Sequence, residues 1–349
     1  MCWKFWDWVP IVALVTHHTP APGVARLIAL DWGTTALRAW LLGDNGRVLD
    51  ARAHDGGLLS VTAGTPTDIR ADTRADDYEK VFAAVCGDWL GAQPGLPAIA
   101  CGMVGSAQGW QEAGYVTVPA DLRFDAATLT RVPHKDGVLH LVPGLRVAPT
   151  GQRTGDVMRG EETQLVGVLD LLDESGDLLV VLPGTHTKWV RIAAGQVESF
   201  TTAMTGELYG LLMEHGILAR TAHAPVRDDA AFTRGLDADI SRGISTALFG
   251  ARALVLDGAL EPSALPDYVS GLLIADEIRH LLPADRKRIV LCGKPDLCRR
   301  YAAALERHDA HPAATLTEEA AARGLWHIAV TSGLVTGDDA ARHRIEEVS

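Results

Sequence analysis

Short apolar runs separated by glycine turns begin at Arg26 and continue along the chain. The first runs cover residues 27–30 and 37–42, and a third segment, 47–54, follows a turn that contains Gly43 and Gly46. Apolar runs of this length with tight turns between them are typical of an antiparallel β-meander. We therefore expect three adjacent strands at the start of the folded chain.

The same pattern recurs about 150 residues later. Residues 178–182 are apolar, a turn with Gly184 and Thr185 follows, and further strands are expected at 188–192 and 196–200. A strand, a glycine–threonine turn and a strand that occur twice indicate two similar domains. Chance is the alternative, because apolar runs and glycine turns are common.

Apolar positions at three- and four-residue steps predict helices elsewhere in the chain. The expected helices cover residues 76–90, 158–172, 205–220, 242–258, 268–282 and 318–330. Short buried strands are expected at 98–103 and 288–292. Strands mixed with helices in this way predict an α/β fold. We place one domain at 26–157 and a second at 158–330, with the final segment, 331–349, returning to the first.

The first 25 residues differ from the rest in composition. Trp3, Trp6 and Trp8 cluster there, and the uncharged stretch 9–24 is interrupted by prolines and two histidines. This stretch is too short and too broken to cross a bilayer. A signal peptide is the alternative, but its apolar region is weak and no clean cleavage site follows. We expect a disordered or artefactual leader.

Composition narrows the class of protein. The 349 residues suggest two domains, and a hydrophobic content of 47 % supports a large core. The net charge is −12 and there is no basic block, which argues against a nucleic-acid partner. Five cysteines without a CxxC pair favour a reducing, cytoplasmic location. No membrane partner is expected, and the oligomeric state is left open, a homo-oligomer included.

The segment from Asp31 to Thr35 has the residues that a phosphate-binding turn needs. Gly33 lets the backbone approach a phosphate, Thr34 and Thr35 can donate hydrogen bonds, and Asp31 can hold a metal ion through water. An ordinary hairpin is the alternative. The second turn, with Gly184, strengthens the phosphate hypothesis because a triphosphate needs donors from two sides.

Other nucleotide-binding motifs are absent. The chain has neither a GxxxxGK[ST] loop nor a GxGxxG fingerprint, and protein-kinase motifs are missing. Gly293, between a strand and a helix, is suited to lie behind an adenine or ribose, although taken alone it is better explained by a plain strand-to-helix turn. Gly324 either permits a close helix crossing or is a tolerated helix glycine.

The order of these features is that of the superfamily containing actin, hexokinase and the sugar kinases. Several segments also resemble the 2-dehydro-3-deoxygalactonokinase family. They are IALDWGTT from Ile28, GMVGS from Gly102, MRGEETQ from Met158, PGTHTKW from Pro183 and MTGEL from Met204. The resemblance implies two actin-like (ribonuclease H-like) ATPase domains with a nucleotide cleft between them. It also implies ATP-dependent phosphorylation, with Mg²⁺, of the terminal (C6) hydroxyl of 2-dehydro-3-deoxy-D-galactonate in galactonate catabolism.

The resemblance also implies site residues. Those expected to contact the sugar acid are Ser106, Gln108, Trp110, Arg159, Lys188 and Glu207, and His186 joins Gly184 and Thr185 at the nucleotide. For Lys188 the alternative is a solvated strand lysine. For the loop that begins at Gly102 the alternative is a surface loop anchored by its tryptophan.

The general base is expected among three acids near the start of the helix predicted at 158–172. Extending the apolar stripe backward from Leu165 reaches Glu161 and Glu162, with Glu161 nearer the centre of the stripe. A carboxylate on an inward face is costly unless it is paired, bound to metal or catalytic. We rank Glu161 first, Glu162 second and Asp156 third. The alternative is that these acids only complement the helix dipole.

Two other functions remain as alternatives. One is a kinase of the same fold that acts on another sugar or 2-keto-3-deoxy acid. The other is a nucleotide-dependent binding or assembly protein, although no segment is long enough for the extra modules that such proteins carry.

Overall fold

The computed structural model describes residues 23–61, 71–152, 154–172, 176–285, 287–316 and 319–336. Within them the chain forms two compact units. The N-terminal unit comprises the described residues up to 176, together with 192–199 and 319–336. The C-terminal unit comprises residues 177–191 and 200–316. Most of the predicted leader, residues 1–22, lies outside the described residues.

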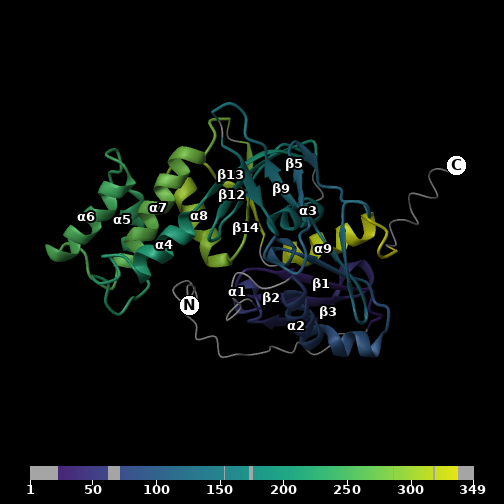
Figure 1. Ribbon diagram of the computed structural model, residues 1–349. Helices are drawn as coiled ribbons and strands as arrows, with labels where there is room; N and C mark the ends of the chain where they lie inside the picture. The colour runs from purple at the N-terminus through teal and green to yellow at the C-terminus, as the bar shows by residue number, and fades with distance from the viewer. Residues whose placement is uncertain are drawn as a thin grey trace. The chain divides into compact units, whose positions relative to one another are not determined.

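A six-stranded sheet forms the centre of the N-terminal unit, with strand order β3-β2-β1-β4-β8-β7 (Figure 1). Its strands are β1 (Leu27–Trp32), β2 (Leu37–Leu42), β3 (Val48–His54), β4 (Ala98–Cys101), β7 (Thr130–His134) and β8 (Gly137–Leu141). β1 and β3 both pair antiparallel with β2, which confirms the predicted meander. β1 is also parallel to β4, so it lies inside the sheet and is buried along nearly its whole length. This position explains its continuous apolar run.

Helices and a small second sheet complete the N-terminal unit. The helices are α1 (Leu58–Val61), α2 (Ala71–Ala92), α3 (Glu161–Leu172) and α9 (Glu319–Thr331), and the second sheet consists of β5 (Tyr115–Thr117), β9 (Gly144–Val147) and β10 (Asp156–Met158). The short strand β6 (Ala120–Asp121) belongs to a different sheet. α3 and α9 cross with their backbones in contact. A methyl group on Gly324 would lie 1.9 Å from the Thr163 carbonyl oxygen, so the close crossing predicted at this glycine is observed.

The sheet of the C-terminal unit contains three parallel strands and repeats the strand–turn–strand pattern. Its strands are β11 (Leu178–Leu182), β12 (Thr187–Ala193), β14 (Arg288–Cys292) and β15 (Pro312–Leu316), in the order β15-β14-β11-β12. β14 is parallel to both β11 and β15. β13 (Gln196–Ala203) begins in the N-terminal unit, where its first two residues pair with β6.

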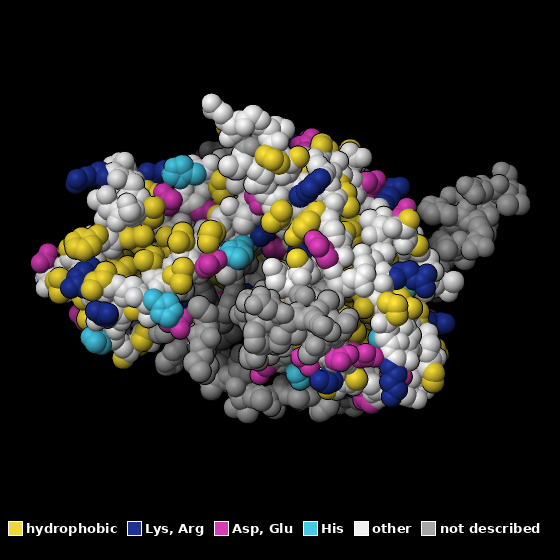
Figure 2. All heavy atoms as spheres, viewed as in Figure 1, with side chains coloured by type: hydrophobic (Ala, Val, Ile, Leu, Met, Phe, Trp, Pro, Cys, Tyr) yellow, Lys and Arg dark blue, Asp and Glu magenta, His cyan; other side chains and the backbone are white. Residues whose placement is uncertain are grey.

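Five helices make up the rest of the described C-terminal unit. They are α4 (Thr205–Glu214), α5 (Asp229–Leu236), α6 (Ile244–Leu256), α7 (Leu265–Leu281) and α8 (Pro295–Glu306). Figure 2 shows hydrophobic side chains gathered over this helical part, where Leu208, Leu211, Phe249 and Leu256 are exposed. Among the described helices, none combines the length and hydrophobicity of a membrane span.

Three sequence-based boundaries differ from the structure. The helix predicted at 158–172 starts at Glu161, because Met158 lies in β10 and Gly160 has a φ of +107° that a helix cannot continue through. The helix predicted at 205–220 ends at Glu214. The leader was expected to end at residue 25, but Ala25 packs against the core and its carbonyl accepts a hydrogen bond from Gln93.

The two units also group the elements differently from the boundary that we placed after residue 157. α3 and α9 belong to the same unit as β1 and β2, because α3 packs on α9 and α9 packs on β1. The strands β5 to β10, between residues 115 and 158, were not anticipated from the sequence. They are short and carry a weaker apolar pattern than the meanders.

Candidate active site

The first candidate phosphate-binding turn joins β1 to β2. The Gly33 N–H donates to the Ala36 carbonyl (N···O 2.9 Å) and closes the turn, and the side chains of Thr34 and Thr35 are exposed. A methyl group on Gly57 would lie 2.3 Å from the Thr35 backbone, so this glycine supports the turn from behind. An exposed turn with two hydroxyl groups is suited to donate hydrogen bonds to phosphate oxygens.

Asp31, the predicted metal-binding residue, lies one position before the end of β1. One carboxylate oxygen accepts a hydrogen bond from Arg38 Nη2 at 2.6 Å, and Cys101 Sγ lies 3.9 Å from the other. The side chain keeps 17 % of its surface exposed. The described residues contain no group of three or more His, Cys, Asp or Glu that could hold a metal ion. The predicted role of Asp31 as a metal-binding residue stays a prediction.

Two glycines bring the end of β4 close to the start of α3. Gly102 has a φ of +91°, and a methyl group on it would lie 2.7 Å from the Trp32 carbonyl oxygen. A methyl group on Gly160 would lie 3.3 Å from the Gly102 Cα. This close approach places the carboxyl groups of Asp31 and Glu162 near one buried thiol. Burial, reinforced by these two carboxylates, raises the pKa of Cys101 well above its ordinary value.

Glu162 is the most deeply buried of the three candidate acids, with 0 % of its surface exposed. Its carboxyl group accepts hydrogen bonds from the Gly160 N–H at 2.6 Å and from Thr163 Oγ1 at 3.2 Å. Burial, together with the nearby charge of Glu161, raises the pKa of Glu162 to about 8. A group with this pKa is mostly protonated at neutral pH, so Glu162 is poorly suited to accept a proton there.

The predicted orientation of the two glutamates on the helix is wrong. Glu161 is half-buried and accepts a hydrogen bond from the Arg159 N–H at 3.1 Å, whereas Glu162 faces the interior. The error arose because the apolar stripe was extended backward through Met158, which lies in β10 and not in the helix. Asp156 also lies in β10, where it is half-buried and accepts a hydrogen bond from the Val157 N–H at 2.7 Å.

The loop after β4 places its predicted substrate residues in different environments. Ser106 is buried, and its hydroxyl has no hydrogen-bond partner within the described part of the chain. Gln108 is exposed. The Trp110 ring stacks on Tyr78, with ring centroids 6.1 Å apart, inside an aromatic cluster. The tryptophan thus anchors the loop, and its contact with substrate stays a prediction.

Arg159 provides a guanidinium group beside this loop. It lies over the Tyr115 ring, 4.2 Å from the ring centroid, and Nη2 donates to the Gly114 carbonyl at 2.7 Å. Nε and Nη1 are buried and have no hydrogen-bond partner among the residues that the structure describes. Nη1 also lies 3.1 Å from the position that a methyl group on Gly105 would take. Two unpaired donors on a cation suit an anionic ligand group such as a carboxylate.

The second candidate turn joins β11 to β12. The Gly184 N–H donates to Thr187 Oγ1 at 3.4 Å, and the Glu207 N–H, in the first turn of α4, donates to the Thr185 carbonyl at 3.0 Å. A methyl group on Gly206 would lie 2.4 Å from the Gly184 carbonyl oxygen. The turn is therefore held against the N-terminus of α4, and the free N–H groups of a helix N-terminus favour anions.

The polar side chains around this turn are closely packed. Lys188 is only 3 % exposed and its Nζ donates to the His186 carbonyl at 3.1 Å, so the alternative of a solvated strand lysine is wrong. The His186 ring nitrogen Nε2 lies 2.5 Å from Glu207 Oε2. The structure brings these three predicted residues together, and their contacts with ligands stay predictions.

Gly293 lies beside the second turn. Its N–H donates to the Leu316 carbonyl at 3.0 Å, and a methyl group on it would lie 3.2 Å from the carbonyl oxygen of Pro183, the residue before Gly184. α8 begins two residues later, at Pro295. The predicted role of Gly293 beside a nucleotide stays a prediction.

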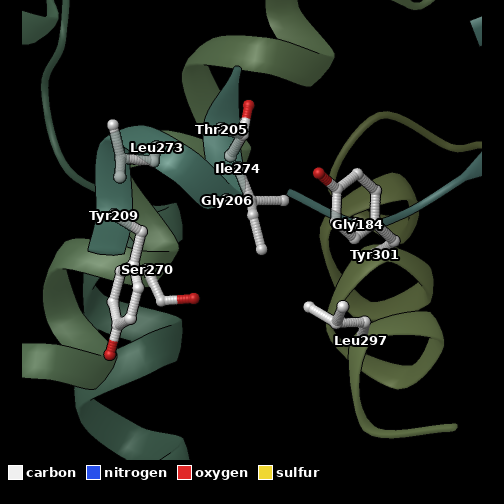
Figure 3. A pocket seen from close by; sticks show the side chains of 9 residues that line it. All are labelled: Gly184, Thr205, Gly206, Tyr209, Ser270, Leu273, Ile274, Leu297 and Tyr301. Atoms are coloured by element: carbon white, nitrogen blue, oxygen red, sulfur yellow. The ribbon is translucent and has the colours of Figure 1, made fainter. Parts of the chain in front are cut away.

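A pocket within the C-terminal unit lies next to the same turn (Figure 3). Its walls are formed by Gly184, Thr205, Gly206, Tyr209, Ser270, Leu273, Ile274, Leu297 and Tyr301. The hydroxyl of Ser270 is buried, has no hydrogen-bond partner in the described part of the chain, and points into the open space in Figure 3. The pocket is mainly apolar and small, with a volume of about 10 Å³, which is roughly the room for one water molecule.

Several residues in and near the pocket beside the second turn were not predicted from the sequence. Ser270 and Tyr301 line the pocket, and the buried Glu277 lies seven residues after Ser270 on α7. Seven residues are close to two helical turns, so both side chains lie on one face of α7. A serine and an acid on one face of a largely apolar helix could have indicated a buried polar site, but the sequence analysis did not consider them.

The chain matches a known protein family over most of its length. The model of the 2-keto-3-deoxy-galactonokinase family matches residues 31–328. A probable 2-dehydro-3-deoxygalactonokinase from Rhizobium meliloti (strain 1021) is 36 % identical over 316 residues, covering 85 % of this chain and 97 % of the relative. The 2-dehydro-3-deoxygalactonokinase of Escherichia coli (strain K12) is 34 % identical over 313 residues, covering 87 % of this chain and 98 % of the relative.

A solved structure shows the same fold. It is the crystal structure of a protein from Sinorhizobium meliloti described as a 2-dehydro-3-deoxygalactonokinase, with a TM-score of 0.74, 34 % identity, and coverage of 87 % of this chain and 98 % of that one. The predicted α/β class of an actin-like sugar kinase is confirmed. On the family match and the identity to both relatives, the chain belongs to the 2-keto-3-deoxy-galactonokinase family.

Proposed function

We propose that this sugar-acid kinase transfers the γ-phosphoryl group of ATP to the C6 hydroxyl of 2-dehydro-3-deoxy-D-galactonate. Family membership supports a phosphotransferase with an alcohol acceptor. The observation that carries the proposal is the second turn, where Gly184 and Thr185 lie against the N-terminus of α4 and beside a pocket. A turn held against a helix N-terminus is suited to the phosphates of a nucleotide.

Both turns are assigned to the phosphates of ATP, and Asp31 is assigned to the metal ion. The backbone and hydroxyls of Gly33–Thr35 and the N–H groups of Thr185 and His186 would donate to phosphate oxygens, Gly184 would let the backbone approach them while its own N–H bonds to Thr187, and Gly293 would lie behind the adenosine. Asp31 would hold Mg²⁺ through water, and the bound ion would supply positive charge next to the phosphates. The support for this assignment is that Asp31 keeps some exposure next to an exposed turn.

The sugar acid is assigned to the loop after β4 and to Arg159. The unpaired donors of Arg159 suit the substrate carboxylate, and the unpaired Ser106 hydroxyl suits a substrate hydroxyl. Gln108 and Trp110 extend the same loop, and Lys188 with Glu207 completes the set that the family resemblance implies. Buried polar groups without partners are uncommon in native proteins, which is why these two support a ligand site.

Glu161 is our first candidate for the general base, ahead of Glu162 and Asp156. The base accepts the proton of the C6 hydroxyl while that oxygen bonds to the γ-phosphorus and the bond to the β–γ bridging oxygen breaks, releasing ADP. Glu161 is half-buried and can reach solvent, whereas the raised pKa of Glu162 keeps it mostly protonated at neutral pH.

The base assignment is tested with Glu161→Gln, Glu162→Gln and Asp156→Asn, each characterised by kcat, KM and an unfolding curve. We expect Glu161→Gln to lower kcat by on the order of 10²-fold. If Glu161→Gln keeps kcat within a few-fold while one of the others loses 10²-fold, the role moves to that residue.

The function is tested by a screen of the purified protein with ATP, Mg²⁺ and a panel of 2-keto-3-deoxy acids and hexoses. We expect the highest kcat/KM for 2-dehydro-3-deoxy-D-galactonate, which would assign the enzyme to galactonate catabolism before an aldolase step, and we infer a cytoplasmic location for it. A clear preference for another acid would assign a related kinase. ATP turnover stimulated by peptide or by self-assembly, and not by any sugar acid, would instead support the binding or assembly protein.

A further inference from the structure

Glu277 is a buried carboxylate on α7 whose partners are all neutral. It is 5 % exposed, and none of the lysine or arginine side chains that the structure describes forms an ion pair with it. Burial raises the pKa of Glu277 above its ordinary value. A buried acid without a cation is expensive unless hydrogen bonds satisfy it, so the bonds that it makes indicate why it is there.

Three donors converge on the Glu277 carboxylate. Trp189 Nε1 donates to Oε1 at 2.6 Å, Tyr301 donates its hydroxyl hydrogen to Oε2 at 2.8 Å, and the Thr205 hydroxyl donates to the same oxygen. The indole N–H can only donate. An ionised carboxylate accepts all three bonds, and each bond to a charged acceptor is stronger than a neutral one.

One of these bonds continues to the second turn. Because Tyr301 donates to Glu277, its oxygen is left to accept from Thr187 Oγ1 at 2.9 Å, and Thr187 Oγ1 in turn accepts from the Gly184 N–H at 3.4 Å. Each hydrogen bond in this series is donated in the direction of Glu277. Thr187 and Tyr301 are both buried, with Thr187 0 % exposed, so the Thr187 hydroxyl acts on the turn from inside the protein.

A second bond leads to the start of α4. Thr205 is the first residue of α4, and the next residue, Gly206, touches the Gly184 carbonyl with no room for a side chain. The same carboxylate therefore holds both the turn and the helix N-terminus that packs on it. Residues of both backbone segments line the pocket.

We propose that Glu277 is a positioning residue that holds the Gly184–Thr187 turn and the N-terminus of α4 in the arrangement that binds the nucleotide phosphates. It acts through Tyr301, Thr187 and Thr205 without contacting the nucleotide. This inference rests on the proposed function, because it assumes that the second turn binds ATP.

The test is a double-mutant cycle read out by nucleotide binding. The full-length variants are Glu277→Gln, Thr187→Val and the double variant, and the dissociation constant for ATP·Mg²⁺ is measured by titration calorimetry without any sugar acid. Thr187→Val keeps the shape and removes the hydroxyl, whereas Thr187→Ser keeps the hydroxyl. We expect each of the first two variants to weaken ATP binding by on the order of tenfold, because each breaks one polar chain.

Coupling between the two positions separates a positioning role from two independent effects. If Glu277 acts through Thr187, the double variant weakens ATP binding little more than the worse single variant. Thr187→Ser should stay within about threefold of the wild type. The KM for the sugar acid should change less than twofold in every variant that turns over, because the effect is confined to the nucleotide side.

Asp267→Asn is the matched control for a general loss of stability. Asp267 is another buried acid on α7, ten residues before Glu277, and it bonds to Arg300 and to the Asp228 N–H instead of to the turn. Unfolding midpoints in urea are compared for all variants. We expect Asp267→Asn to lower the midpoint while leaving ATP affinity within twofold of the wild type.

Several outcomes would overturn the proposal. ATP affinity within twofold of wild type in folded Glu277→Gln would do so, as would full additivity in the double variant, or an equal loss of affinity in Asp267→Asn. If Glu277→Gln does not fold, Thr187→Val and Thr187→Ser still test the proposal. Equal ATP affinities for these two variants would show that the Thr187 hydroxyl does not position the turn. A wild-type chain that binds no ATP·Mg²⁺ would instead reject the proposed function, and the Glu277 role with it.

Discussion

Replacing Glu162 with glutamine should make the protein more stable, and by an amount that grows with pH. Glu162 is fully buried, and its pKa is raised to about 8 from an ordinary value of 4.5. A group with a raised pKa in the folded state holds its proton more tightly there than in the unfolded chain. Its contribution to stability is fully present below pH 4.5 and is lost as the pH rises to 8. Glutamine is neutral at every pH and has no such loss.

The size of the effect follows from the two pKa values. Each pKa unit corresponds to about 1.4 kcal/mol of free energy, so the shift of Glu162 amounts to roughly 5 kcal/mol above pH 8. At pH 7 the loss is still incomplete and amounts to roughly 3 kcal/mol. The hydrogen bond from the Gly160 N–H can be kept by the amide oxygen of glutamine, so the substitution mainly removes the ionisable group.

The assay is urea unfolding of the wild type and Glu162→Gln, followed by tryptophan fluorescence at pH 4, 5, 6, 7, 8 and 9. The quantity of interest is the difference in unfolding free energy between the two proteins, in which the titration of all other groups cancels. We expect this difference to rise by roughly 1.4 kcal/mol per pH unit between pH 5 and 8 and then to level off.

A control on the same helix has the opposite sign. The pKa of Asp170 is lowered, because hydrogen bonds from His327 and Arg323 outweigh its partial burial. Its contribution to stability is present above its ordinary pKa of 3.8 and is lost only as the pH falls below that value. Because His327 contacts Asp170, the control compares His327→Gln with the double variant His327→Gln/Asp170→Asn, and the difference between these two proteins should be constant between pH 5 and 9. A constant difference for Glu162→Gln as well would refute the raised pKa and restore Glu162 as a candidate base.

Three further predictions use the same assays. Asp31→Asn should lower kcat by on the order of 10²-fold at saturating Mg²⁺, and near-normal turnover would remove Asp31 from the mechanism. Gly324→Ala should cost about 2 kcal/mol or more in urea unfolding, because its methyl group would lie 1.9 Å from the Thr163 carbonyl oxygen. Gly87→Ala, which enters open space on α2, should gain about 1 kcal/mol, and equal effects at both glycines would contradict the packing argument. Removing residues 1–22 should leave turnover and the unfolding midpoint unchanged, and a loss of either would show that the leader belongs to the fold.

The features that were predicted from the sequence depend on neighbouring residues. Both meanders follow from apolar runs and glycine turns, and β14 was predicted with its observed bounds because an apolar run is closed by Gly293. The close crossing at Gly324 was one of two alternatives, and the structure selects it. In each case the residues that indicate the feature lie close together in the sequence.

The features that were missed depend on contacts between distant segments. The start of α3 is set by Gly160, whose conformation is needed because the backbone passes close to Gly102, 58 positions earlier. Periodicity alone extended the helix through Met158 and so placed Glu161 on the inner face instead of Glu162. Glu277 was missed for the same reason, because its partners come from β12, α4 and α8.

The two glycine–threonine turns look alike in sequence, yet different contacts support them. Gly57 packs against the backbone of the first turn. The half-buried Arg38 forms an ion pair with Asp31, and the Asp31 side chain stays partly exposed. The second turn is backed by Gly206 and tied to a buried acid, Glu277, that has no access to ligand. The partly exposed acid at the first turn is therefore suited to contact a metal ion or a phosphate. The buried acid at the second turn is suited only to hold other residues in position. Losing Asp31 should reduce kcat, and losing Glu277 should reduce ATP affinity, so the kinetic parameter that changes identifies which kind of support was removed.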